Sequence, residues 1–268
     1  MTKYLDATGL SYLWSKIEAT FAKKGEGGGG SSTSYEIMTL AEYNAMASHD
    51  ADTFYFLHGD IPTLKVMHGD TEVWPDVPYD AEVEYLESTG TQWIDAQIYG
   101  DISVNYKVTL QVVGTAQYQN VFGDRESSSS RRFSLMINMG TNNPTAFMHT
   151  NCGTSNPVDV PNSYRTSGLV TVRKQGLNLY VNGDLIGTYT NQSFTTPHTL
   201  KVFTATNAGT PSSNYYGRIM HLRFSNTSGL LRDFIPVRVG QVGYLYDKVS
   251  GELFGNDGTG SFVIGPDK

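Results

Sequence analysis

The chain has a single cysteine, Cys152, among its 268 residues. One thiol excludes an intrachain disulfide, and a disulfide-free chain of this size is typical of synthesis and assembly in a reducing cytoplasm. The sequence also has no run of about 18 apolar residues and no basic N-terminal segment followed by an apolar stretch. We therefore expect neither a membrane-inserted segment nor a classical export signal.

Positive charge is scarce, with 19 Lys and Arg against 26 Asp and Glu and a formal net charge of -7. The excess of acid is concentrated in residues 35–82, whereas residues 83–268 are close to neutral. In this C-terminal part the longest basic run is Arg131-Arg132. Because nucleic acid phosphates are bound by segregated basic patches, we expect no nucleic acid partner.

Catalytic and metal-binding patterns are missing as well. The histidines are scattered without metal-ligand spacing, and no Asp-x-Asp-x-Asp-Gly run offers calcium ligands. The carboxylates from Asp80 to Glu84 fit a solvated edge strand better than the acid pair of a glycosidase, and no Glu-x-Asp-x-Glu run is present. The sequence therefore predicts no catalytic residue, no metal and no cofactor.

Glycine and aromatic residues are abundant, with 28 Gly, 17 Tyr and 12 Phe, as is typical of short strands joined by turns. Apolar and polar residues alternate strictly, and two such apolar sets are Val104, Tyr106, Val108, Leu110, Val112 and Phe133, Leu135, Ile137, Met139. Asn182-Gly183 lies between two further β runs and predicts a hairpin. We expect a mainly β protein in which residues 79–268 form an antiparallel jelly-roll β-sandwich. A closed barrel is the alternative.

Three shorter segments precede this domain. Residues 35–78 contain a capping box from Thr39 to Glu42, which predicts a short helix ending near His49, then a three-strand meander in a small α+β module. Residues 25–34 form a flexible Gly/Ser linker, for which an engineered origin is an alternative. Residues 1–24 predict an amphipathic helix whose apolar stripe is Leu10, Leu13, Trp14, Ile17 and Phe21. Such a short helix is marginal alone, so we expect it to serve attachment or oligomerisation.

Several stretches together resemble a known family. They are "YLDATGLSYLWSKIEATF", "LAEYNAMASHDADTFYFL" with "VMHGDTEVWP", and "AEVEYLESTGTQWIDA" with "LRDFIPVRVGQVGYLYDKVSGELFGNDGTG". The chain is similar to modular tail, fibre or receptor-binding proteins of tailed bacteriophages and prophages that end in a concanavalin A-like, laminin G-like domain. The resemblance implies that "EYLES" lies beside "FVIGPD". It also implies a virion component made in the bacterial cytoplasm and a homo-oligomer, most plausibly a trimer.

Glycan binding needs aromatic faces and planar polar groups at a loop-lined rim or groove. The polar loops "DRESSSSRR", "HTNCGTSNP" and "NAGTPSSNYYG" offer such a rim, and the candidate glycan-binding residues are Tyr118, Arg125, Arg132, Tyr215 and Tyr216. We expect the partner to be a host cell-surface glycan or another phage tail protein. The alternative is a depolymerase-type glycan hydrolase on the same fold.

Overall fold

The computed structural model describes residues 34–51, 53–58, 65–68, 71–74, 77–115, 117–127, 130–138, 146–154 and 156–268. The chain divides into two compact units, residues 1–76 and 77–268. The predicted helix of residues 1–24, with its apolar stripe, and the linker up to residue 33 lie outside the described residues. Among the described helices, none has the length and apolar character needed to cross a membrane.

The first unit contains a four-stranded sheet in the order β1-β2-β3-β4 and one helix. Its elements are β1 (Ser34–Thr39), α2 (Leu40–Ala45), β2 (Thr53–His58), β3 (Lys65–His68) and β4 (Thr71–Trp74). The predicted capping box is confirmed, because the backbone N–H of Glu42 donates to Oγ1 of Thr39 over 3.1 Å and that of Thr39 donates to Oε2 of Glu42 over 2.7 Å. Tyr43, Tyr55 and Leu57 form its small core.

Two details of this unit differ from the sequence prediction. The helix ends at Ala45 rather than near His49, because Met46 is extended and the ring of His49 stacks back on Tyr43 at 3.8 Å between ring centroids. The segment "SYEIMT" forms strand β1, which pairs in parallel with β2. The module is therefore a helix with four strands, not a helix with a three-strand meander.

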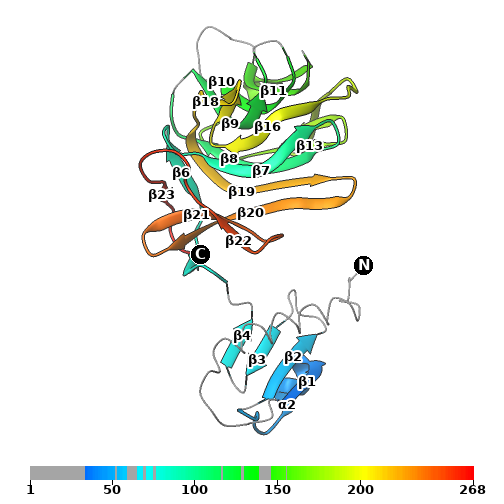
Figure 1. Ribbon diagram of the computed structural model, residues 1–268, viewed down its shortest axis with the longest axis vertical. Helices are drawn as coiled ribbons and strands as arrows, with labels where there is room; N and C mark the ends of the chain where they lie inside the picture. The colour runs from blue at the N-terminus through cyan, green and yellow to red at the C-terminus, as the bar shows by residue number, and fades with distance from the viewer. Residues whose placement is uncertain are drawn as a thin grey trace. The chain divides into compact units, whose positions relative to one another are not determined.

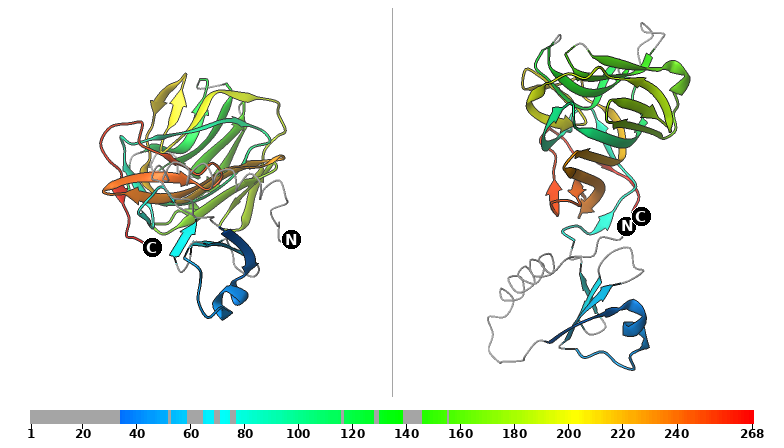
Figure 2. Two further views of the ribbon diagram at one scale, coloured as in Figure 1. Left: turned by 60° about the horizontal axis from the view of Figure 1, so that its bottom comes forward. Right: turned by 90° about the vertical axis from the view of Figure 1, so that its right-hand side faces the viewer.

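The second unit, the sandwich, is built from two sheets (Figures 1 and 2). One sheet has eight strands, β7 (Ile94–Asp101), β9 (Tyr118–Arg125), β10 (Arg132–Asn138), β11 (Ala146–Gly153), β12 (Pro157–Pro161), β16 (Thr195–Val202), β17 (Ala205–Asn207) and β18 (Thr210–Ser212). Its main order is β12-β11-β10-β9-β16-β7. We call this sheet the front sheet.

The other sheet has eleven strands, and we call it the back sheet. Its strands are β5 (Ala81–Glu82), β6 (Leu86–Thr89), β8 (Asn105–Val112), β13 (Val170–Gln175), β14 (Asn178–Val181), β15 (Asp184–Thr188), β19 (Tyr216–Asn226), β20 (Gly229–Val239), β21 (Val242–Asp247), β22 (Glu252–Phe254) and β23 (Val263–Ile264). Its main order is β15-β14-β13-β8-β19-β20-β21-β22, and the 3-10 helix η1 (Asn162–Tyr164) follows β12.

The core lies between the two sheets. The apolar residues of the alternating segment 104–112 are all buried, as are Phe133, Leu135 and Ile137, which confirms the predicted alternation for the described residues. Phe122 of the front sheet meets Tyr106 and Phe224 of the back sheet in edge-to-face contacts with ring centroids 4.9 and 5.2 Å apart. These contacts between sheets are those of a sandwich, not of a closed barrel.

The end of the chain closes the back sheet beside its beginning (Figure 1). Strand β23 pairs with β6, with Val263 opposite Glu87, and Arg238 binds Asp267 through two hydrogen bonds of 2.7 and 2.6 Å. The expected proximity of "EYLES" and "FVIGPD" is confirmed. The carboxylates of Asp80 and Glu82 face Arg238 and Lys268 at 3.9 Å, which places them at this closure.

The predicted hairpin at Asn182-Gly183 is also confirmed. Both residues have positive φ, 51° and 100°, and they join β14 to β15 with Val181 opposite Asp184. A two-residue loop with positive φ at both positions matches the right-handed twist of the flanking strands, and Asn-Gly adopts it at low cost.

Because the core and the closure both lie within residues 77–268, we expect this segment to fold without the rest of the chain. Expressed alone, it should be monodisperse and unfold in one cooperative transition, followed by circular dichroism during urea titration. Aggregation, or a gradual loss of signal, would show that the sandwich depends on residues before Val77.

Candidate functional site

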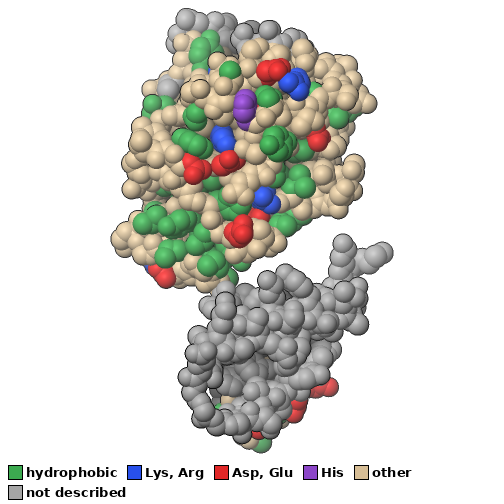
Figure 3. All heavy atoms as spheres, in the orientation of Figure 1, with side chains coloured by type: hydrophobic (Ala, Val, Ile, Leu, Met, Phe, Trp, Pro, Cys, Tyr) green, Lys and Arg blue, Asp and Glu red, His purple; other side chains and the backbone are tan. Residues whose placement is uncertain are grey.

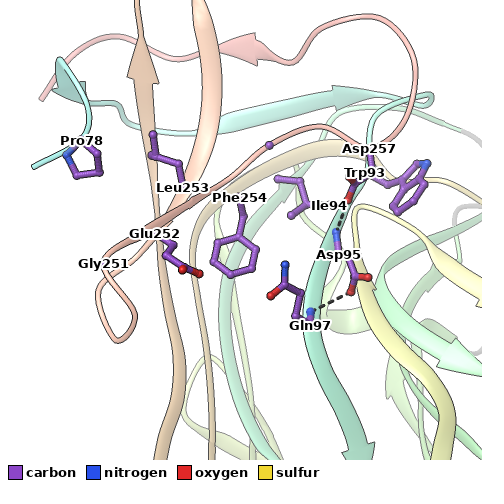
Figure 4. A pocket seen from close by; sticks show the side chains of 11 residues that line it. Pro78, Trp93, Ile94, Asp95, Gln97, Gly251, Glu252, Leu253, Phe254 and Asp257 are labelled. Atoms are coloured by element: carbon purple, nitrogen blue, oxygen red, sulfur yellow. Dashed lines mark hydrogen bonds between the residues drawn. The ribbon is translucent and has the colours of Figure 1, made fainter.

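A pocket of about 610 Å³ opens where an edge strand of each sheet comes together, β7 from the front sheet and β22 from the back sheet (Figure 4). Its lining combines aromatic, apolar and planar polar side chains. The lining residues are Pro78, Trp93, Ile94, Asp95, Gln97, Gly251, Glu252, Leu253, Phe254, Gly255 and Asp257. The two sides of the pocket are therefore more than 150 residues apart in the chain.

Hydrogen bonds between the segment before β7 and the loop 255–260 fix one end of the pocket. Asn256 accepts the backbone N–H of Trp93 through Oδ1 at 3.2 Å, and Asp257 accepts that of Asp95 through Oδ2 at 2.9 Å. The N–H of Asp257 donates back to the carbonyl of Trp93 over 2.8 Å. Trp93 and Asp257 are thus held side by side, as Figure 4 shows.

Asp95 carries a fixed negative charge at the pocket wall. Its carboxylate accepts hydrogen bonds from Nζ of Lys201 at 2.5 Å, Oγ1 of Thr199 at 3.0 Å and the backbone N–H of Gln97 at 2.9 Å. Burial opposes its ionisation, but the bonds from Lys201, Gln97 and Thr199 outweigh burial and hold the pKa of Asp95 below its ordinary value. Lys201 also lies 5.6 Å from the ring centroid of Trp93, so the indole is flanked by a cation.

Gln97 has an unusual backbone for the middle of a strand. Its φ is 55°, in the left-handed region that non-glycine residues rarely adopt, and the pairing of β16 with β7 shifts register at this level. The turn is supported by the hydrogen bond from the Gln97 N–H to Asp95. As Figure 4 shows, the carboxamide of Gln97 lies between Asp95 and Phe254, so the strained residue places an amide in the pocket.

These groups suit a polar ligand with apolar faces. Trp93 offers a stacking surface, Phe254 and Ile94 an apolar floor, and Gln97 and Asp257 offer planar donors and acceptors. On the face of the sandwich turned to the viewer in Figure 3, charged side chains are scattered in small groups of mixed sign. Recognition on that face therefore cannot depend on a broad field of one charge.

The five glycan-binding candidates from the sequence lie at other places in the sandwich. Arg125 and Arg132 are brought together as directly paired residues of β9 and β10. Tyr118 begins β9 and is 50% exposed, and Tyr216, 38% exposed, has its ring close to Gly90. Tyr118, Arg125, Arg132 and Tyr216 stay predictions.

Tyr215 requires a correction, because its side chain is completely buried. Its hydroxyl donates to the carbonyl of Gln111 over 2.7 Å, and its ring lies near Phe203 with centroids 6.3 Å apart. It belongs to the core and has no face to offer a sugar. In "SNYYG" two adjacent tyrosines enter a strand, and alternation sends them to opposite sides. The sequence gives no sign of which one points inward.

In the described part of the chain we find neither a metal-binding cluster nor a reactive thiol. No group of three His, Cys, Asp or Glu residues there is arranged to hold a metal ion. Cys152 is buried, and burial raises the pKa of its thiol to about 12, which disfavours the reactive thiolate.

Comparisons with known proteins give no family for this chain. No protein-family model and no curated protein sequence matches it. A solved structure from Bacteroides ovatus ATCC 8483, named provisionally as a carbohydrate-binding protein, is 11% identical with a TM-score of 0.49, over 94% of this chain and 84% of that one. Two structures of the Ruminococcus gnavus IT-sialidase CBM40 also resemble it, one of them bound to α2,3-sialyllactose. Identities are 15 and 14% and TM-scores 0.40 and 0.36, over 53 and 55% of this chain and 89 and 87% of those. At these TM-scores, neither a family nor a ligand follows for this chain.

Sequence reasoning missed the pocket residues. "TQWIDA" and "GNDGTG" enter the sequence analysis only as parts of the stretches that carry the resemblance. The available signal was the Trp-x-Asp spacing of Trp93 and Asp95 at the start of a strand. It was not decisive, because Asp95 and Asp257 are 162 residues apart and nothing local indicates that they meet.

The ionised state of Asp95 leads to a prediction about stability and pH. Because its folded-state pKa lies below the ordinary value of about 4, its stabilising effect should be complete above that value and be lost as pH falls through the folded pKa. Asp95→Asn should lower the free energy of unfolding at pH 7 by about 1–3 kcal/mol. The difference from the wild type should shrink as the pH falls below the ordinary carboxyl pKa of about 4 and through the lower folded-state pKa.

Urea titrations across this pH range measure the effect. Glu84→Gln is the matched control, because Glu84 is exposed and the change also neutralises one carboxylate. It should shift the unfolding free energy by less than about 0.5 kcal/mol. A pH-independent difference for Asp95→Asn would mean that the ion pair with Lys201 does not stabilise the sandwich.

Proposed function

We propose that the sandwich is a non-catalytic glycan-binding domain and that the chain is a tail or fibre protein of a tailed bacteriophage. The protein would display this domain towards the host surface. The observation that carries the glycan-binding role is the pocket in which Trp93 lies beside the ordered carboxylates of Asp95 and Asp257. The phage role is supported by the sequence resemblance alone.

The pocket combines the two kinds of contact that a sugar requires. The C–H face of a pyranose ring packs on an indole, while its hydroxyls exchange hydrogen bonds with carboxylate and amide oxygens. Asp95, Asp257 and the backbone of Trp93 are fixed by hydrogen bonds within the protein, so little side-chain ordering is needed when a ligand binds. Phe254 forms the apolar wall of the pocket.

A glycan hydrolase remains the alternative because three carboxylates line the same pocket, Asp95, Glu252 and Asp257. A hydrolase needs one of its two acids to be protonated at working pH, and enzymes achieve this by raising its pKa. Asp95 has the opposite character, since its ion pair with Lys201 keeps it ionised. Release of reducing ends from host polysaccharide, lost in Glu252→Gln, would favour the hydrolase.

Binding should depend on the indole of Trp93. Trp93→Ala should weaken glycan binding by about 1–3 kcal/mol, by analogy with aromatic truncations at interface hot spots. That loss corresponds to a factor of about 5 to 150 in Kd. Trp93→Phe should keep part of the affinity. The measurement is a glycan array with the isolated sandwich, followed by calorimetry on the best ligand.

Tyr180→Ala is the matched control, because it removes a partly exposed aromatic ring from β14 of the back sheet. It should leave the affinity unchanged, and the unfolding transition of each variant shows whether the fold is intact. If Tyr118→Ala weakens binding and Trp93→Ala does not, glycan recognition takes place on the outer face of β9. If no glycan binds the wild type, the proposed binding function is wrong.

The attachment role has its own test, which concerns residues outside the described part of the chain. The predicted helix is too short to be stable alone, so its apolar stripe should pack against other copies of the chain or against the tail. The resulting clustering of sandwiches would raise avidity through a higher effective concentration. Removing residues 1–24 should reduce the oligomeric mass in light scattering and prevent entry into virions. Unchanged mass and unchanged incorporation would exclude the helix as the anchor.

A further inference from the structure

Two arginines lie directly opposite each other on the front sheet. Arg125 ends β9, Arg132 begins β10, and the two are register partners. Directly paired residues project on the same side of a sheet, and successive residues alternate. Because Phe133 and Leu135 are core residues, the alternation puts Arg132 and its partner on the outer face. Like charges at directly opposite positions destabilise a sheet, so this pair requires an explanation.

Neither arginine is neutralised by the described part of the protein. No carboxylate there lies within ion-pair distance of either one, and both Nε atoms are buried without a hydrogen-bond partner. Within those residues, Nη2 of Arg125 donates a hydrogen bond to Oγ of Ser212 at 3.1 Å, which fixes Arg125. Burial, together with the charge of Arg125, lowers the pKa of Arg132.

The two acids next to Arg125 in the chain are already engaged. Glu126, the next residue after Arg125, forms an ion pair of 2.7 Å with Arg131. Asp124 pairs with Phe133, so it faces inward, where it is buried and 3.3 Å from Nδ1 of His198. Burial raises the pKa of Asp124, which further limits its use as a counter-charge. The described residues therefore provide no counter-charge for the two guanidinium groups, and a bound ligand could supply one.

The surroundings of the pair are polar and short of bulky side chains. Beyond Arg132 the neighbouring position on β11 is Gly153, over which the carboxamide of Gln192 lies. Beyond Arg125 the neighbour is Asn207 of β17. The guanidinium fork is suited to bidentate binding of carboxylate, phosphate or sulfate, and a pair of forks matches an anionic group better than a neutral hydroxyl.

A continuous stretch of the same face connects the arginines with the pocket. Lys201 of β16 pairs with Asp95 of β7 on one side and with Gly123 of β9 on the other, and Gly123 pairs with Ser134 of β10. Gly123 has no side chain that could block this stretch. A Cβ at that position would lie only 2.6 Å from the Cβ of Ser134. From β7 to β10 are three strand spacings, on the order of 15 Å. A short oligosaccharide can span that distance.

We propose that Arg125 and Arg132 form an anion subsite, so that the domain selects glycans bearing an acidic substituent. The inference rests on the glycan-binding function proposed above and names its ligand class. The shared chemistry is an anionic oxygen group, whether the carboxylate of an acidic sugar, a phosphate or a sulfate.

The first experiment compares oligosaccharides that differ in one residue, glucose, glucuronate, glucose 6-phosphate or glucose 6-sulfate. The wild-type sandwich should bind at least one acidic form at least tenfold more tightly than the neutral form, and this preference should weaken as salt rises. Arg125→Gln and Arg132→Gln should each remove the preference while affinity for the neutral form stays within twofold. The acidic form whose affinity exceeds that of the neutral form by the largest factor identifies the anionic group that the subsite prefers.

The control variant is Arg173→Gln, which removes the same charge from the back sheet, where Arg173 lies over the ring of Tyr180. It should keep the full preference. If Arg173→Gln loses as much preference as Arg132→Gln, the selectivity comes from overall charge and the subsite is wrong. If the wild type binds neutral and acidic forms equally, the subsite is wrong while glycan binding stands.

A second experiment needs no glycan. An anion that binds the folded protein raises the melting temperature by mass action. Sulfate also stabilises proteins in general, so the specific effect must be read from a comparison of variants. The rise in Tm from sodium chloride to sodium sulfate at equal ionic strength should therefore be larger for the wild type and Arg173→Gln than for Arg132→Gln. Equal rises in all three would overturn the subsite. A specific rise without any glycan binding would keep the subsite and refute the proposed function.

Discussion

The pairing of the two ends of the sandwich is the constraint on which the rest of this structure depends. Strand β23 lies beside β6, the salt bridge between Arg238 and Asp267 secures the C-terminus, and the loop 255–260 is bonded to the segment before β7. The β23–β6 pairing and the bonds to the loop 255–260 join parts of the chain that are separated by more than 150 residues, so their loop-closure cost can be offset only when both sheets are in place. The bonds between the loop 255–260 and the segment before β7 also fix one end of the pocket, and the site therefore depends on the closed sandwich.

Polar residues are used in two distinct ways in this domain. At the pocket, Asp95 is satisfied by Lys201, Thr199 and the backbone, which fixes its charge and its position. On the outer face of the front sheet, Arg125 and Arg132 are placed together with buried Nε atoms that lack partners in the described residues. A satisfied group contributes to stability, whereas an unsatisfied one has a cost that binding can relieve. That difference is the physical ground for assigning ligand contact to the arginines.

The proposed non-catalytic recognition and the proposed multivalent display are consistent with each other. A pocket at the side of a sandwich, with one fixed carboxylate and one indole, offers few contacts, and the affinity expected from it is modest. Linking several copies through a flexible tether converts later binding events into intramolecular ones. The predicted order of a short helix, a Gly/Ser linker, the α+β module and the proposed binding domain would suit such display.

The sequence by itself determined the class of fold and those elements of secondary structure that have strong local signals. Alternation at 104–112 predicted buried strands, Asn182-Gly183 predicted the hairpin, and Thr39 with Glu42 predicted the helix start, because each of these signals is local. Tertiary structure alone decided which residues meet. It buried Tyr215 while leaving Tyr216 partly exposed, and it brought Trp93 to Asp257 and Arg125 to Arg132. Pairing between distant strands depends on register and closure over the whole domain, which no local pattern encodes.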